Sequence, residues 1–150
     1  MKATGIIRRI DDLGRVVIPK EIRRTLKIRE GDPLEIFLGE QNTICFKKYC
    51  VLGKMDDEVL RVAVEMARKS NLAPIAIYDR GEKLKGMENF PSYVPDEWMN
   101  YREPFIYNST YGVYPIIIDG GTEGYVVCPW TEVSLEMKMI ARYLSVAIEE

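Results

Sequence analysis

The 150-residue chain has an apolar fraction of 47%, a charged fraction of 29% and a formal net charge of −2, which are typical of a globular protein and exclude disordered or collagen-like classes. The N-terminus lacks the apolar stretch of a secretory signal, and no apolar run is long enough to cross a bilayer, so we expect a cytoplasmic protein without membrane contact. The three cysteines have spacings that fit neither a zinc site nor a disulfide framework. Histidine, the commonest metal ligand and general base, is absent. We therefore expect no metal, no cofactor and no catalytic activity.

The charge is distributed unevenly along the chain. Residues 1–48 contain 11 Lys and Arg against 7 Asp and Glu, a net charge of +4, and residues 49–150 contain 10 against 16, a net charge of −6. A basic segment followed by an acidic one indicates two modules with different roles. We expect domains at residues 1–49 and 56–150, joined by a linker at residues 50–55.

The basic segment predicts short strands around one short helix. β-Branched and alternating apolar residues indicate strands at residues 5–10, 15–18, 34–38 and 43–47. Asp11 to Gly14 predicts a turn in which Gly14 is free to adopt positive φ. Pro19 ends the second strand and suits the first position of a helix that reaches Leu26. Residues 39–42 predict a hairpin turn.

So small a set of elements buries too little apolar surface to be stable alone. Segments of this size usually need a disulfide, a metal or a partner chain. Because the sequence supplies no cysteine pairing and no metal ligands, we expect an obligate dimer.

The stretch TGIIRRIDDLGRVVIPKEIRRTLKIREGDPLEIFLGEQNTICFKKY resembles the DNA-binding domain of the AbrB family of bacterial transition-state regulators, and most of all a sporulation regulator within it. The resemblance covers about the first 49 residues. It implies a mainly-β swapped-hairpin barrel in which two chains interlace their strands, with double-stranded DNA as partner. It also implies which side chains meet DNA. Arginines match the family's contact positions, and two further cations are expected to assist through phosphates. The contact positions are Arg8, Arg15, Arg23 and Arg24, and the assisting residues are Arg9 and Lys2.

The chemistry of arginine agrees with this role. Cationic side chains neutralise phosphates and release counterions, and the planar guanidinium also reads guanine edges. The alternative is an ordinary solvated face. Between Arg8 and Arg24, however, six cations meet only Asp11, Asp12 and Glu21, whereas an ordinary surface mixes the two signs more evenly.

The acidic segment predicts an α+β domain, an antiparallel sheet flanked by helices. Asp56 caps a helix that reaches about Ser70, and a strand follows at residues 73–79. Strands at residues 113–118 and 123–129 are joined by a turn, and Pro115 predicts an edge or a bulge. Residues 95–100 predict a short helix, and a last helix runs from Thr131 to about Ala147.

The last helix is apolar on two sides. One side repeats at intervals of four and three residues, as in a helix–helix seam. We expect this seam to contact a second subunit, which makes the protein a homodimer or a homotetramer; the alternative is internal core. The seam residues are Val133, Met137, Ile140 and Leu144.

The order of elements resembles a reduced GAF domain. That resemblance implies a small-molecule effector, with the aromatic residues between Phe90 and Tyr111 as candidate pocket lining. The alternative is that these aromatic side chains are core, which is their commoner role.

We therefore expect a DNA-binding transcriptional regulator whose second domain mediates assembly or senses a signal. The alternative function is an antitoxin of a toxin–antitoxin pair, which binds DNA and a protein partner. The folded character of residues 56–150 argues against the extended tail of such antitoxins.

Overall fold

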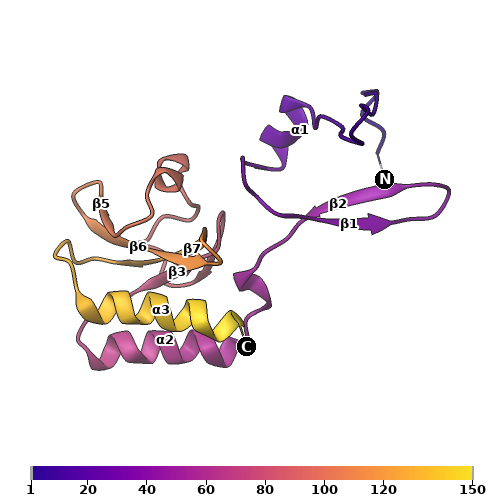
Figure 1. Ribbon diagram of the computed structural model, residues 1–150. Coiled ribbons are helices and arrows are strands. Elements are labelled where there is room, and N and C mark those ends of the chain that lie inside the picture. Colours follow the sequence, from indigo (N-terminus) through magenta and orange to yellow (C-terminus); the bar gives the residue numbers. More distant parts are fainter. Residues whose placement is uncertain (1, 150) are drawn as a thin grey trace.

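A computed structural model describes residues 2–149 of the chain. It has an N-terminal part that contains one short helix and one hairpin, and a C-terminal part in which a sheet lies against two helices (Figure 1). Within residues 2–149, no helix has both the length and the apolarity to span a bilayer. The elements are α1 (Lys20–Thr25), β1 (Leu34–Leu38), β2 (Ile44–Lys48), η1 (Leu52–Lys54), α2 (Asp57–Lys69), β3 (Ala76–Tyr78), β4 (Lys83–Lys85), η2 (Asp96–Asn100), β5 (Phe105–Tyr107), β6 (Tyr111–Ile118), β7 (Gly121–Cys128) and α3 (Leu135–Glu149).

The hairpin and the short helix of the N-terminal part confirm the sequence prediction. β1 and β2 pair antiparallel from Leu34 opposite Lys48 to Leu38 opposite Ile44. The amide of Gly39 donates to the carbonyl of Thr43 at 2.7 Å, which leaves residues 40–42 as the turn, and Gln41 and Asn42 have positive φ, at 56° and 57°. Pro19 is the N-cap of α1 and precedes its first residue.

The two strands predicted at residues 5–10 and 15–18 are absent from the single chain. The turn between them does form: the amide of Asp11 donates to the carbonyl of Arg15 at 3.0 Å, and Gly14 has φ of 80°. A strand needs a neighbour to take up its backbone hydrogen bonds. In the described part of the chain, neither segment lies beside another strand.

The N-terminal part also lacks a core of its own. Every residue of the two buried apolar clusters lies at or beyond Leu52. Among residues 2–51, twelve large apolar side chains are exposed, with Ile7 and Leu38 the most exposed at 86% each. This part of the chain therefore presents apolar surface that none of the described residues covers.

The C-terminal part has the predicted α+β arrangement. Its antiparallel sheet has the strand order β4-β3-β7-β6-β5. Helices α2 and α3 lie together against one face of the sheet (Figure 1). Side chains of β7 alternate between two cores: Val126 and Cys128 face the helices, while Tyr125 and Val127 join an aromatic cluster on the other face.

Two details of this part differ from the prediction, and a third agrees with it. β4 and β5 are additional strands, and three-residue strands carry little periodicity from which to predict them. Helix α3 begins at Leu135 and not at Thr131, and the amide of Met137 donates to Ser134 Oγ at 3.3 Å. Pro115 behaves as predicted: β5 pairs only with residues 111–113 of β6, and a bulge follows at Ile116–Ile117.

The segment predicted as a linker is partly structured. It contains η1, and Leu52 is fully buried in the helix-side core. Leu52 lies directly over Gly124 of β7, where a Cβ atom would overlap its side chain and the carbonyl oxygen of Tyr78. The connection is therefore fastened to the sheet.

Candidate nucleic-acid interface

The turn from Asp11 to Arg15 holds the first of the predicted contact residues. Asp11 Oδ1 accepts the amides of Leu13 and Arg15 at 2.9 and 2.8 Å, and Asp11 Oδ2 accepts Arg15 Nε at 2.8 Å. These hydrogen bonds from the Arg15 amide and guanidinium hold the pKa of the Asp11 carboxyl below its usual value. The ion pair orients the Arg15 side chain, which is still 71% exposed.

Helix α1 carries the second pair of predicted residues in its last turn. Arg23 Nε donates to the carbonyl of Ile18 at 3.0 Å, which ties the helix to the segment before it. Arg23 and Arg24 lie at the negative end of the helix dipole, a favourable place for cations. Both side chains are exposed.

The other three predicted residues have few contacts. Arg8 Nη1 donates to the carbonyl of its neighbour Ile7 at 3.1 Å. Arg9 and Lys2 are exposed, and among the described residues neither is in an ion pair. No hydrogen bond or ion pair joins these three to Arg15 or to α1 within residues 2–149.

We call Lys2, Arg8, Arg9, Arg15, Arg23 and Arg24 the arginine surface. All six are exposed, and within the described residues only Arg15 has a carboxylate partner. That partner holds Nε, so the two terminal nitrogens of Arg15 are left for an external acceptor. An ordinary solvated face would pair more of its cations. The arrangement suits a polyanion with regularly spaced phosphates.

The predicted oligomerisation seam is wrong for three of its four residues. Met137, Ile140 and Leu144 are at most 1% exposed and belong to the core between α3 and the sheet. A residue buried inside its own chain cannot contact a second subunit. Val133 is 67% exposed but precedes α3. The alternative, internal core, therefore holds for Met137, Ile140 and Leu144.

Most aromatic residues between Phe90 and Tyr111 belong to a core on the second face of the sheet, whereas Tyr101 is 46% exposed. Trp98 is fully buried, and its ring makes edge contacts with Tyr78, Phe105, Tyr107 and Tyr125 at centroid distances of 5.3 to 6.2 Å. Of the two roles considered for these residues, packing is the one observed.

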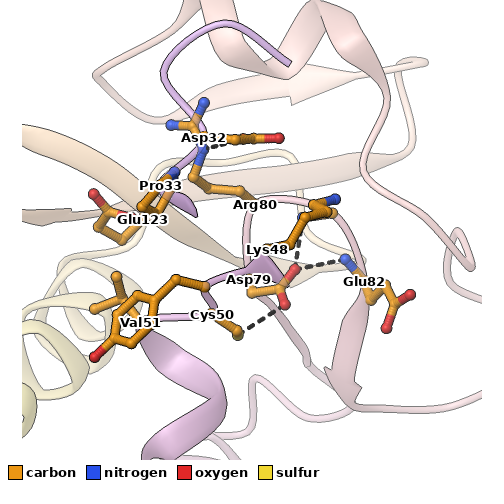
Figure 2. Close-up of a pocket in the computed structure, with 11 residues that line it drawn as sticks. Asp32, Pro33, Lys48, Cys50, Val51, Asp79, Arg80, Glu82 and Glu123 are labelled. Atoms are coloured by element: carbon orange, nitrogen blue, oxygen red, sulfur yellow. Dashed lines mark hydrogen bonds and ion pairs between the residues drawn. The ribbon is translucent and has the colours of Figure 1, made fainter. Parts of the chain in front are cut away.

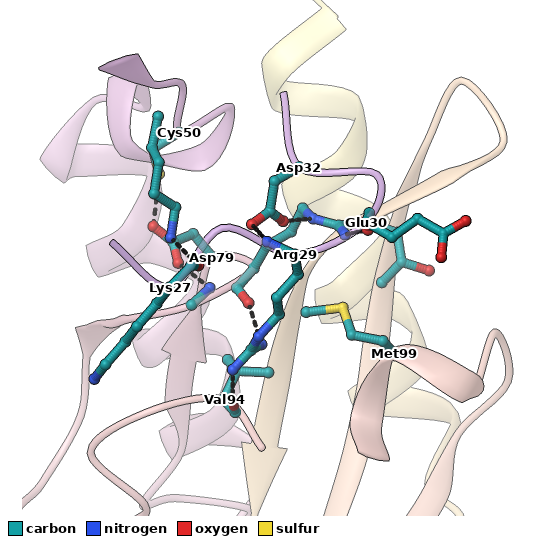
Figure 3. A network of polar contacts seen from close by, with 12 residues as sticks. Lys27, Arg29, Glu30, Asp32, Cys50, Asp79, Val94 and Met99 are labelled. Atoms are coloured by element: carbon teal, nitrogen blue, oxygen red, sulfur yellow. Dashed lines mark hydrogen bonds and ion pairs between the residues drawn. The ribbon is translucent and has the colours of Figure 1, made fainter. Parts of the chain in front are cut away.

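Sequence reasoning missed a polar network between the two parts of the chain. Arg29, between α1 and β1, donates to the carbonyls of Arg80 and Val94 at 3.1 and 2.6 Å (Figure 3). Arg80 Nε pairs with Asp32 Oδ1 at 2.7 Å (Figure 2). A possible signal was the Arg29-x-x-Asp32 pair just before β1, but its partners are distant in the sequence and leave no local pattern.

A pocket of about 200 Å³ lies next to this network (Figure 2). One wall comes from Asp32, Pro33 and residues 48–51, and the other from residues 79–82 and Glu123. Cys50 Sγ, in the first wall, donates to Asp79 Oδ2 in the second at 2.9 Å. The pKa of the Cys50 thiol is raised to about 12, chiefly by burial and further by this carboxylate. The Cys50 side chain is therefore not a reactive thiolate.

The N-terminal part is similar to known bacterial proteins. The model of the family described as antidote-toxin recognition MazE, bacterial antitoxin, matches residues 7–45. Stage V sporulation protein T of Bacillus subtilis strain 168 is 68% identical over 57 residues, which are 38% of this chain and 32% of that protein. Transition state regulatory protein AbrB of the same organism is 51% identical over 69 residues, which are 42% of this chain and 71% of that protein.

Solved structures cover the same region. The solution structure of the N-domain of the transcription factor abrB is 59% identical and covers 33% of this chain and 92% of that chain, with a TM-score of 0.30. The N-terminal DNA recognition domain of the Bacillus subtilis transition-state regulator AbrB has the same identity, with a TM-score of 0.28. The chain spans about a third of the length of stage V sporulation protein T.

Proposed function

This chain belongs to the AbrB family of bacterial transition-state regulators, and we propose that it is a DNA-binding transcriptional regulator that occupies promoter DNA. The arginine surface makes the contacts, and no catalytic step is involved. The family and the similarity to a sporulation protein favour a cytoplasmic role in the control of sporulation genes.

One observation carries the proposal: six exposed cations lie on one small module, and within residues 2–149 a single carboxylate pairs with them. Their positive potential attracts the phosphate backbone even though the whole chain is acidic, because the local field steers association. Arg15 and Arg23 are the best prepared, since a hydrogen bond from Nε orients each guanidinium and leaves its terminal nitrogens for phosphate.

The functional form is a dimer in which the N-terminal parts interlace into a swapped-hairpin barrel. Exposed apolar side chains and the unpaired segments at residues 5–10 and 15–18 support this assembly. A second chain would supply both the missing strand partners and the missing core. The two-fold axis of the dimer then presents every arginine twice.

Residues 56–150 form a reduced GAF-like domain that mediates assembly or senses a signal, with residues 50–55 as the connection. A five-stranded antiparallel sheet covered by two helices supports the GAF-like assignment. Because most of the aromatic side chains that were candidates for a pocket lining pack together as core, an unidentified small-molecule effector would have to bind elsewhere.

The antitoxin alternative is less well supported. The antitoxin family model covers only residues 7–45. Residues 57–149 form a sheet and two helices instead of an extended segment that could wrap around a toxin.

Binding to genomic fragments across a series of salt concentrations, followed by sequencing of the bound DNA, tests the proposal. On the best-bound fragment, we expect Arg15→Ala and Arg23→Ala each to weaken binding by about tenfold or more. Each should also lower the salt dependence by about two released counterions, because the dimer loses one phosphate partner in each chain. Arg61→Ala, at an exposed arginine on α2, is the matched control and should change neither quantity.

Wild-type affinity in both Arg15→Ala and Arg23→Ala would remove the arginine surface from the interface. Failure of the wild-type protein to bind any fragment at low salt would reject the function itself.

A further inference from the structure

The two parts of the chain are joined at a second place besides the connection at residues 50–55. The segment from Lys27 to Asp32, which follows α1, lies against loops of the C-terminal part (Figure 3). Nζ of Lys27 lies 3.9 Å from the centre of the Tyr93 ring, and the guanidinium of Arg29 lies 5.2 Å from the same centre. The N-terminal part is therefore fixed in direction as well as tethered.

Arg80 is the centre of this contact. It pairs with Asp32 at 2.7 Å, and its terminal nitrogens donate to the carbonyls of Glu30 at 3.1 Å and Thr122 at 2.9 Å. One guanidinium thus holds the segment before β1 and the start of β7 together. The rigid planar fork of arginine suits such a junction, and lysine would not replace it.

Burial makes these contacts mutually dependent. The side chain of Asp32 is 4% exposed, and those of Arg29 and Arg80 are 18% exposed. A buried carboxylate without its cation carries a large desolvation penalty. Without Arg80, Asp32 would keep only its hydrogen bond from the Arg29 amide, at 2.8 Å. The segment would then be held chiefly by Arg29, which donates to the carbonyls of residues 80 and 94 and pairs with Asp96 at 2.8 Å, and it would move more freely against the C-terminal part.

The contact between the two parts of the chain is polar, and a pocket lies beside it. Interfaces between domains that are small and polar allow the domains to move relative to one another. Here a pocket of about 200 Å³ borders both Asp32 and Arg80. Such a junction can fix the direction of the N-terminal part relative to the C-terminal part, and it can also open and release that part.

We propose that Arg29, Asp32 and Arg80 form a clamp that sets the direction in which α1 and the arginine surface face DNA, so that the C-terminal part controls DNA binding. The clamp rests on the proposed function. Arg80 is a positioning residue in it and has no contact with DNA. When the clamp opens, the arginine surface must be oriented during binding, which lowers affinity.

The test uses the full-length chain and the genomic fragment that the wild-type protein binds best. Arg80→Ala and Asp32→Asn break the same ion pair from opposite sides, and Arg61→Ala is the matched control. We expect each clamp variant to bind about fivefold more weakly or worse, because orientation is lost. The salt dependence should stay unchanged, since every phosphate contact is kept. In the double variant, the loss should be no larger than in the worse single variant.

Small-angle X-ray scattering of the same proteins without DNA gives an independent readout. Both clamp variants should have a larger radius of gyration than wild type while thermal unfolding still shows a folded chain. If Arg80→Ala fails to fold, Asp32→Asn decides the test.

The possible failures are distinguishable. Normal DNA binding by the wild-type protein together with unchanged affinity in the clamp variants would overturn the clamp alone. An unchanged radius of gyration would also overturn it. A wild-type protein that ignores DNA would reject the proposed function.

Discussion

At the scale of single residues, the arginines of this chain fall into two groups that composition cannot separate. Arg15 is 71% exposed and held by a neighbouring turn, whereas Arg80 is 18% exposed and joins distant segments. The first kind remains available to an external anion. The second kind has its donors engaged inside the chain, which fixes structure. Exposure and partners, more than residue type, decide which arginine is available to an external anion.

Cys50 leads to a prediction about thiol reactivity. Burial and the Asp79 carboxylate raise its pKa from 9.0 to about 12, so at pH 9 the folded protein has roughly a thousandth of its Cys50 as thiolate. We expect alkylation of Cys50 by iodoacetamide to be at least about a hundredfold slower in the folded protein than in denaturant. Peptide mass spectrometry after timed quenching measures both rates.

The direction of the pH dependence follows from the same cause. Because the folded-state pKa is raised, the rate should keep rising between about pH 9 and pH 11 without a plateau. Asp79→Asn removes the carboxylate and should make Cys50 react faster. Equal rates in the folded and the denatured protein would contradict the hydrogen bond between Cys50 and Asp79.

At the scale of elements, regular patterns were predictable and short or non-local features were not. The cap at Asp56 sets the start of α2, and its side chain accepts the amide of Glu58 at 3.0 Å. The turn residues in the sequence identify the hairpin of β1 and β2 and the hairpin of β6 and β7. The predicted strands at 5–10 and 15–18 have the right residue types but lack a neighbour in the chain. The seam on α3 was misassigned because periodicity shows which residues are buried but not what buries them.

The seating of η1 on β7 leads to a prediction about stability. A methyl group at Gly124 would overlap Leu52 and the carbonyl oxygen of Tyr78. We expect Gly124→Ala to lower the free energy of unfolding by about 1–3 kcal/mol, as overpacking does in close-packed cores. Denaturant unfolding of the full-length chain measures it.

Gly121→Ala, in the same strand, is the control for Gly124→Ala. A methyl group there would meet the end of the Glu123 side chain at 3.4 Å and the carbonyl oxygen of Ile118 at 3.7 Å, so the change should stay within about 0.5 kcal/mol. The double variant with Leu52→Ala should be less destabilised than the sum of the two single losses, because the two side chains compete for one space. Unfolding of Gly124→Ala at the wild-type midpoint would show that Leu52 does not lie on β7 in solution.

At the scale of the whole molecule, the two parts of the chain differ in how much apolar core they contain. From Leu52 onward it has two cores, one on each face of the sheet. Residues 2–51 have a hairpin, a short helix and twelve exposed large apolar side chains. The arginine surface and the change from a basic to an acidic part were predictable, because both depend on local residue types. The contact between Arg80 and Asp32 was not, because it depends on how the two parts meet.

The exposed apolar side chains lead to the last prediction. Leu38 is 86% exposed in the single chain, so an aspartate there would be nearly harmless if the protein were a monomer. If a second chain covers the N-terminal part, Leu38→Asp buries a charge in the shared core and should shift sedimentation toward the monomer at micromolar concentration. Met87→Asp, at a side chain 57% exposed in a loop of the C-terminal part, is the control and should sediment as wild type does.

DNA binding by Leu38→Asp should fall along with the dimer, because the arginine surface is no longer doubled and the salt dependence reflects half as many contacts. A wild-type protein that sediments as a folded monomer, with Leu38→Asp indistinguishable from it, would mean that this apolar surface is left in water. The interlaced barrel would then have to be abandoned, since its core depends on a second chain covering that surface.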